Sequence, residues 1–203
     1  MSRITVAPIV EGHGEVEAVR ILLERIWYEL FAGEFIDVLK PIRQPRPKLA
    51  KEDGLRKAVA LATGKLRQTG SADPMLVLVL LDADKDCPAE LAPQLLTWAR
   101  ATDSTMDSIC VIAKVEYETW FVAAAESLKA FLTLGPGDPP SDPESGGSAK
   151  GWIKKRFRQP TYSETRHQPR MTSAMDLTLC RGHSPSFDKL CRDLEMRVSS
   201  RRA

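Results

Sequence analysis

The sequence lacks the features typical of membrane proteins, of secreted proteins and of proteins with a structural zinc site. None of its apolar runs approaches the about 20 residues of a transmembrane helix, so we expect no membrane partner. The N-terminus, Met1 to Val6, has no apolar signal core, and we therefore expect a cytoplasmic protein. No C-x-x-C spacing is present. Reduced thiols are thus a better interpretation than a zinc site for Cys87, Cys110, Cys180 and Cys191.

Several catalytic motifs are also absent. Glu11-Gly-His-Gly-Glu15 fits neither G-x-x-x-x-G-K-[ST] nor G-x-G-x-x-G, which argues against a P-loop or dinucleotide site. Asp82-Ala-Asp-Lys-Asp86 begins like a calcium-binding EF-hand loop, but Cys87 replaces the required glycine and Pro93 the required glutamate. A phosphatase-type Asp-x-Asp-x-Thr motif also fails, because Asp86 stands in place of threonine. No Ser-His-Asp arrangement is indicated.

What is present is an ordinary globular composition with an uneven charge distribution. The 203 residues are 43% hydrophobic and 28% charged, enough for one domain with a helical appendage. The net charge of +2 divides into acidic segments at 1–37 and 73–149 and basic segments at 38–72 and 150–203. A metal site flanked by surfaces that bind phosphate groups would produce this pattern. Uneven surface charge without such a site is also common.

Strand and helix patterns alternate four times along the first two thirds of the chain. A continuous apolar run such as Met75–Leu81 is typical of a strand covered on both faces. The alternation predicts an open α/β sheet of about four parallel strands flanked by helices. We expect strands at 4–10, 35–42, 75–81 and 108–113, with helices at 15–33, 52–67, 89–101 and 116–131.

The chain changes character near residue 135. Residues 135–147 are rich in Gly, Pro, Ser and Asp and predict a flexible linker or lid. We therefore expect an α/β domain over 1–134 and a basic helical extension over 148–203 that packs on it. Its helices are predicted near 148–157, 171–180 and 185–198.

Carboxylates follow three of the four predicted strands. Since the carboxyl ends of parallel strands meet at one edge of a sheet, we expect these groups to converge. Buried carboxylates are costly unless their charge is matched, and hard divalent ions such as Mg²⁺ or Mn²⁺ prefer oxygen ligands. The pattern predicts a site for one or two such ions. The candidate ligands are Glu11, Glu15, Asp82, Asp84, Asp86, Glu116 and Glu118.

Each of these groups also has a purely structural interpretation. Asp86 is as well explained by a helix cap or turn as by metal binding. Glu15 and one of Glu116 and Glu118 fit a charge in the first turn of a helix, and the sequence does not choose between the last two. Asp82 and Asp84, two residues apart in an extended chain, are expected to face the same side.

Val10-Glu-Gly12 and Leu80-Leu-Asp-Ala-Asp84 resemble the two motifs of the Toprim domain, the metal-dependent module of topoisomerases, DnaG-type primases and several nucleases. The Glu11-x-x-x-Glu15 spacing is similar to that of the overcoming-lysogenization-defect nucleases. That resemblance implies a Toprim-like, Rossmann-like fold in which Glu118 or Glu116 helps to hold a second ion. It also implies a functional lysine, for which Lys114 and Lys150 are candidates, and a separately encoded ATPase partner in antiphage defence.

Nearly the whole chain resembles the Toprim-like family numbered 4276 among domains of unknown function. Besides the two Toprim motifs, the resemblance rests on Glu116-Tyr-Glu-Thr-Trp120, Ala149-Lys-Gly151, His167-Gln168 and Ser184-Pro-Ser-Phe187. The chain shows no tyrosine-nucleophile domain, which argues against topoisomerase chemistry.

The C-terminal segment combines basic and aromatic residues. Such interleaving suits a nucleic-acid backbone with some base stacking, although an amphipathic helix explains it equally well. The candidate contacts are Lys150, Lys154, Lys155, Arg156 and Arg158. His167, in a predicted polar loop, is a candidate base or phosphate contact, with an ordinary surface histidine as the alternative.

The best-supported hypothesis is a nuclease that hydrolyses phosphodiester bonds of DNA or RNA with bound Mg²⁺ or Mn²⁺. Its candidate catalytic residues are Glu11, Asp82, Asp84, Lys114 and His167. A non-catalytic module that binds metal and nucleic acid or protein is the first alternative, and a nucleotidyl or small-phosphate transferase is the second. The sequence leaves open whether the protein forms a homodimer.

Overall fold

Five parallel strands form the central sheet of the protein. The computed structural model describes residues 3–199, without the side chains of 198 and 199. The strand order is β2-β1-β4-β5, and β3 pairs with β1 beyond the end of β2. The strands are β1 (Arg3–Val10), β2 (Phe35–Val38), β3 (Ile42–Arg43), β4 (Met75–Asp82) and β5 (Asp107–Ala113). The expected fold class, an open parallel α/β sheet, is confirmed.

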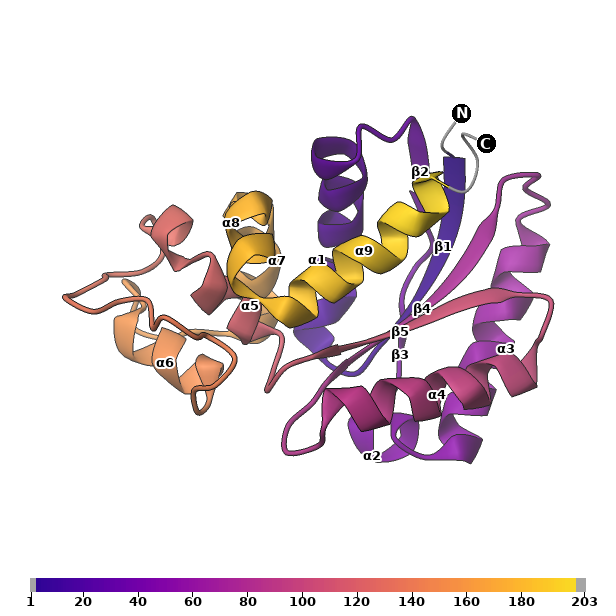
Figure 1. Cartoon of the computed structure of the whole chain (residues 1–203), viewed down its shortest axis with the longest axis horizontal. Coiled ribbons are helices and arrows are strands. Elements are labelled where there is room, and N and C mark those ends of the chain that lie inside the picture. Colours follow the sequence, from indigo (N-terminus) through magenta and orange to yellow (C-terminus); the bar gives the residue numbers. More distant parts are fainter. Residues whose placement is uncertain (1–2, 200–203) are drawn as a thin grey trace.

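The sheet has an apolar core on each face. Alternate residues of β4, such as Leu78 and Val79, enter opposite cores, which explains why this strand is apolar throughout. One face is covered by α3 (Glu52–Gln68) and α4 (Pro88–Thr102). The other is covered by α1 (His13–Arg25) and α9 (Pro185–Ser199), as Figure 1 shows.

A group of helices lies beyond the carboxyl end of β5 (Figure 1). They are α5 (Glu118–Ala123), the 3₁₀ helix η2 (Ala125–Leu128), α6 (Ala149–Arg156), α7 (Glu164–Ala174) and α8 (Leu177–His183). Side chains of α5, α7 and α8 join the same apolar core as α1 and α9. The helices of the predicted extension therefore share a core with the α/β sheet.

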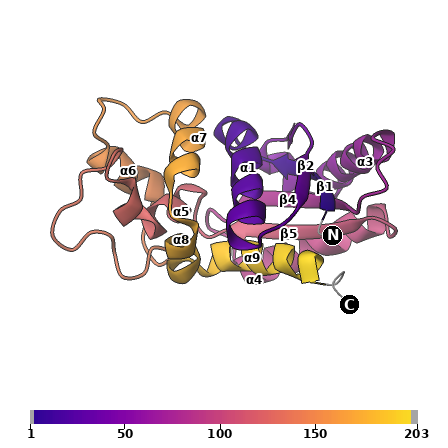
Figure 2. The ribbon, with the colours of Figure 1, turned by 90° about the horizontal axis from the view of Figure 1, so that it is seen from above.

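Helix α7 runs alongside α1, as Figure 2 shows. A glycine permits the close approach: a Cβ built on Gly14 would lie 1.9 Å from Oε1 of Gln168 and 2.9 Å from the main-chain carbonyl carbon of Glu164. Any larger residue at position 14 would push the two helices apart. Beyond its C-terminus, α1 continues as one π-helical turn, η1 (Ile26–Leu30).

The structure departs from the sequence-based elements in three places. The strand expected at 35–42 is two short strands, because Pro41 cannot continue a hydrogen-bonded ladder. The helix expected at 116–131 divides into α5 and η2. The helix expected at 171–180 is wrong: α7 begins earlier, includes Pro169, and ends before α8 starts at Leu177. Within residues 3–199, no helix is long and apolar enough to cross a membrane.

Candidate metal centre

Three carboxylates meet where β1 and β4 end. Glu11 directly follows β1, Glu15 lies in the first turn of α1, and Asp82 is the last residue of β4. One oxygen from each lies within 4.8 Å of the others. Adjacent parallel strands bring these residues together, as expected from the sequence. We call this group the carboxylate triad.

Main-chain donors hold two members of the triad in place. Oε2 of Glu15 accepts hydrogen bonds from the amides of Glu11, at 3.2 Å, and Gly12, at 3.4 Å. The carboxylate of Glu15 thus folds back over the glycine turn that starts α1. Oδ1 of Asp82 accepts a hydrogen bond from the amide of Tyr117 at 2.7 Å. Main-chain hydrogen bonds therefore fix the orientation of two of the three carboxylates.

The crowding of these carboxylates makes their charged forms unfavourable. Burial, followed by the charge of Glu11, raises the pKa of Glu15 to about 8. Burial, together with the charges of Glu15, Glu11 and Glu118, also raises the pKa of Asp82. The pKa of Glu11 is raised by burial as well, although Arg46 opposes the shift. Glu15 consequently retains its proton near neutral pH unless a cation replaces it.

The donor set fits a hard divalent ion such as Mg²⁺ or Mn²⁺. All three groups are carboxylates, the ligand type that these ions prefer. Oε2 of Glu11 is buried without a hydrogen-bond partner in the described structure, so this oxygen is available as a ligand. A cation at the triad would satisfy that oxygen and relieve the repulsion between the carboxylates.

Asp84 and Asp86, the other two aspartates among the predicted ligands, both pair with Arg46, which lies in the short helix α2 (Arg46–Leu49). Its Nε lies 2.9 Å from Oδ2 of Asp84, and its Nη2 contacts the carboxylate of Asp86. The predicted arrangement, with Asp82 and Asp84 facing one side of an extended chain, is wrong. The backbone of Asp84 turns to a φ of +49°, and its carboxylate points to the arginine.

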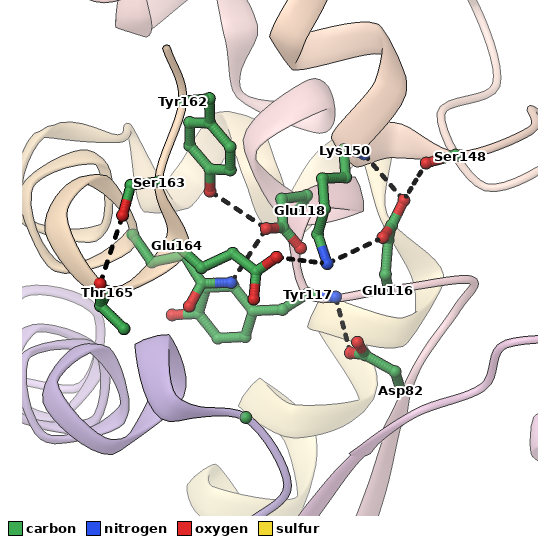
Figure 3. Close-up of polar contacts among 12 residues, drawn as sticks. Asp82, Glu116, Tyr117, Glu118, Ser148, Lys150, Tyr162, Ser163, Glu164 and Thr165 are labelled. Carbon is green, nitrogen blue, oxygen red and sulfur yellow. Dashed lines mark hydrogen bonds and ion pairs between the residues drawn. The ribbon is translucent and has the colours of Figure 1, made fainter.

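A further acidic side chain, that of Glu118, lies close enough to the triad to raise the pKa values of Glu15 and Asp82, and Figure 3 shows its polar contacts. Oε1 of Glu118 accepts hydrogen bonds from the hydroxyl of Tyr162, at 3.1 Å, and from Nε2 of Gln168, at 3.0 Å. The Glu118 side chain is fully buried, its Oε2 has no partner in the described structure, and burial raises its pKa. Its charge also raises the pKa of Asp82, so Glu118 belongs electrostatically to the triad.

Lys150, in α6, bridges an acidic residue of α7 and one of the segment between β5 and α5. Its Nζ lies 2.8 Å from Glu164 and 3.6 Å from Glu116, and Figure 3 shows it between the two carboxylates. Oε1 of Glu116 also accepts hydrogen bonds from Ser148 and from the Lys150 amide, each at 2.8 Å. The charge of Lys150 lowers the pKa of Glu118 and of Glu11, so this lysine faces the acidic site.

Two predicted catalytic residues, His167 and Lys114, have contacts other than the triad carboxylates. His167 does not lie in a polar loop: it is buried in α7, its Nδ1 accepts a hydrogen bond from the Ser163 amide, and its ring packs against Phe157 and Tyr162. Burial lowers its pKa, so the ring is neutral. Lys114 lines a separate hollow of about 240 Å³ with Glu144 and Lys189.

The other basic residues of the predicted nucleic-acid contact differ in their surroundings. Lys154 and Lys155 are exposed on α6. Arg156 instead pairs with Asp138 at 2.6 Å and lies over the ring of Trp152. Arg158 donates a hydrogen bond to the carbonyl of Lys129 at 2.7 Å. The two arginines therefore hold the segment before α6 in place.

Sequence reasoning missed several residues of this region. Arg46 stands in a basic segment, but nothing local connects it with aspartates about forty positions away. No sequence motif indicated that Tyr162 and Glu164 lie in this region. Gln168 was part of a motif but had no assigned role, although its amide contacts Glu118.

Comparison with known proteins gives one family and one structural similarity. No curated protein matches the sequence. The structure of the C-terminal region of the Burkholderia pseudomallei OLD protein is similar over 98% of both chains, with 12% identity and a TM-score of 0.34. The model of the family described as Domain of unknown function (DUF4276) matches residues 10–195, and the chain therefore belongs to that family.

Proposed function

We propose that the protein is a divalent-metal-dependent nuclease of the Toprim type that hydrolyses phosphodiester bonds of DNA or RNA. The observation that supports this most directly is the carboxylate triad, whose oxygens lie within 4.8 Å of one another at the carboxyl edge of a parallel sheet. The Toprim motifs of the sequence, Glu11 and Asp82-Ala-Asp84, supply two of its members.

In this proposal the chain's residues have separate tasks. Glu11, Glu15 and Asp82 hold one ion, and Glu118, with its unpartnered buried oxygen, is positioned to assist with a second. When bound, divalent ions supply positive charge to phosphate oxygens and activate water for attack on phosphorus. Without a bound ion, Glu15, whose pKa is about 8, holds a proton near neutral pH, and metal binding would release that proton.

Positive side chains near the site suit a polyanionic substrate. Lys150 lies among the carboxylates, and Lys154 and Lys155 extend the same helix as exposed charges. A nucleic-acid backbone that followed α6 would pass these lysines close to the acidic site. The ATPase partner implied by the family resemblance stays a prediction.

The test is cleavage of supercoiled plasmid, single-stranded DNA and RNA with Mg²⁺ or Mn²⁺. Wild type and Asp82→Asn are compared, because asparagine keeps an acceptor for the Tyr117 amide while removing the ligand charge. Cleavage by wild type alone supports the proposal. Equal cleavage by both proteins indicates a contaminant or a different site.

A non-catalytic metal- and nucleic-acid-binding module is the second candidate. The ion pair between Asp84 and Arg46 favours it, since one of the Toprim aspartates is already neutralised within the chain. Tight Mn²⁺ binding without turnover of any of the three substrates would support this function over the nuclease.

A further inference from the structure

Arg46 contacts four residues at and just beyond the end of β4. Its Nε pairs with Oδ2 of Asp84 at 2.9 Å, and its Nη2 donates to the carbonyl of Ala83 at 3.0 Å and also reaches Asp86. Its Nη1 donates to the main-chain carbonyl of Asp82. The several N–H donors of one guanidinium group thus hold the loop that follows β4 in place.

The same guanidinium faces the carboxylate triad. Nη1 of Arg46 lies 4.0 Å from Oε2 of Glu11, a buried triad oxygen that has no hydrogen-bond partner among residues 3–199. The charge of Arg46 lowers the pKa of Glu11, whereas that of Asp84 raises it. Arg46 therefore lies between the triad and Asp84, the second aspartate of the Toprim motif Asp82-Ala-Asp84.

Arg46 is held more firmly than the carboxylate it binds. Its side chain is 16% exposed, whereas that of Asp84 is 61% exposed. The backbone of Asp84 is nevertheless fixed, because its amide donates to the carbonyl of Val115 at 2.8 Å and its φ is +49°. Rotation of the Asp84 side chain alone is the motion that the structure leaves open.

We propose that Arg46 is an internal counter-ion that competes with a divalent cation for the carboxylate of Asp84. The inference rests on the proposed metal site and adds a control element to it. With Arg46 engaged, the site offers three carboxylates. When Asp84 turns from Nε of Arg46 toward the triad, the site offers four, and the cost of breaking the ion pair lowers the apparent affinity for the metal.

The test measures Mn²⁺ binding by titration calorimetry on the full chain, without nucleic acid. Arg46→Gln is expected to lower the dissociation constant about tenfold, because it frees Asp84 and removes a nearby positive charge. Arg43→Gln is the matched control, since Arg43 is an exposed arginine at the end of β3, in register with Val10. Its dissociation constant is expected to stay within about twofold of wild type.

A double-mutant cycle separates competition for Asp84 from general charge removal. In an Asp84→Asn background, Arg46→Gln is expected to change the dissociation constant by less than about threefold. Arg46→Lys keeps the charge but loses the fork, and it is expected to bind Mn²⁺ with an affinity between those of wild type and Arg46→Gln.

The possible results of these titrations either support the inference or overturn it. Tighter binding by Arg46→Gln that disappears in the Asp84→Asn background supports the inference. Unchanged or weaker binding overturns it, and so does a gain of equal size in both backgrounds. Thermal unfolding without metal shows whether Arg46→Gln is folded, and an unfolded Arg46→Gln leaves Arg46→Lys to decide by the same criteria. Absence of Mn²⁺ binding in every variant, wild type included, instead rejects the proposed metal site.

Discussion

The main-chain amide of Tyr117 donates a hydrogen bond to Oδ1 of Asp82 over 2.7 Å. This bond joins the tip of β4 to the segment that follows β5. It occupies one oxygen of a carboxylate that also faces Glu11 and Glu15. Asp82 therefore positions the loop before α5 and is also a candidate ligand for a cation, and we expect these two roles to respond differently to mutation.

The first prediction separates the two tasks of Asp82. Without metal, Asp82→Asn is expected to unfold at or above the wild-type temperature, because it relieves repulsion within the triad and keeps an acceptor for Tyr117. Asp82→Ala also loses the hydrogen bond and is expected to be about 1 kcal/mol less stable than Asp82→Asn. Thermal unfolding in EDTA measures both. An Asp82→Ala protein more stable than Asp82→Asn would contradict the assigned hydrogen bond.

The second prediction concerns the contact between α1 and α7. Gly14→Ala is expected to lower the melting temperature by about 5 °C, because a Cβ at this position overlaps Gln168 and the backbone of Glu164. Gly64→Ala in α3 is the matched control, since nothing lies within 4 Å of its added Cβ. It is expected to raise the melting temperature by about 2 °C through helix propensity. Equal effects at both positions would mean that the two helices can separate at little cost.

The sequence allowed the elements that carry the triad to be predicted because their signals are local. Continuous apolar runs mark β1 and β4, and the acidic residues at their ends follow directly. Parallel pairing of adjacent strands then brings Glu11 and Asp82 together without further information.

The remaining features depend on contacts between distant segments. The geometry of Asp84 could not be predicted, since its left-handed backbone and its partner Arg46 both arise from tertiary packing. The start of α7 was missed because Pro169 interrupts the helical pattern. His167 was consequently assigned to a polar loop, although its ring is buried against two aromatic side chains.

The third prediction concerns the basic residues near α6. Substitution of both Lys154 and Lys155 by glutamine is expected to weaken binding to single-stranded DNA and to reduce the slope of log K against log salt by about 1 to 2. The melting temperature should stay the same, because both lysines are exposed. Fluorescence anisotropy over a series of salt concentrations measures the slope. An unchanged slope would exclude both lysines from the nucleic-acid contact.

Arg156→Gln provides the contrast to the lysine variant. This arginine pairs with Asp138 and covers the ring of Trp152, so its loss is expected to lower the melting temperature by about 3 °C. Because the guanidinium is engaged within the chain, the salt slope of DNA binding should stay within about 0.5 of wild type. A large change in slope with no loss of stability would assign Arg156 to the DNA contact instead.

The fourth prediction follows from the proton that Glu15 retains. The pKa of Glu15 is raised from 4.5 to about 8 on folding, chiefly by burial. A raised pKa of an acid stabilises the fold fully at pH values below 4.5, and that contribution is lost as the pH rises through 8. His167, whose pKa is lowered, acts in the opposite direction only below its ordinary pKa of 6.5. The decline above neutral pH therefore reports on the triad together with the buried thiols of Cys110, Cys180 and Cys191, whose pKa values burial also raises from 9. The Glu15→Gln variant separates the contribution of Glu15 from that of the thiols.

Without metal, the melting temperature of wild type is expected to fall by about 5 °C between about pH 7 and about pH 9. Glu15→Gln should show a smaller decline, because the amide at this position carries no charge at any pH. Millimolar Mg²⁺ should restore most of the wild-type loss, since a cation takes the place of the departing protons. Differential scanning fluorimetry in EDTA and in Mg²⁺ measures all three curves. A wild-type melting temperature that rises over this interval would contradict the raised pKa of Glu15, and restoration of equal size in Glu15→Gln would remove this residue from the metal site.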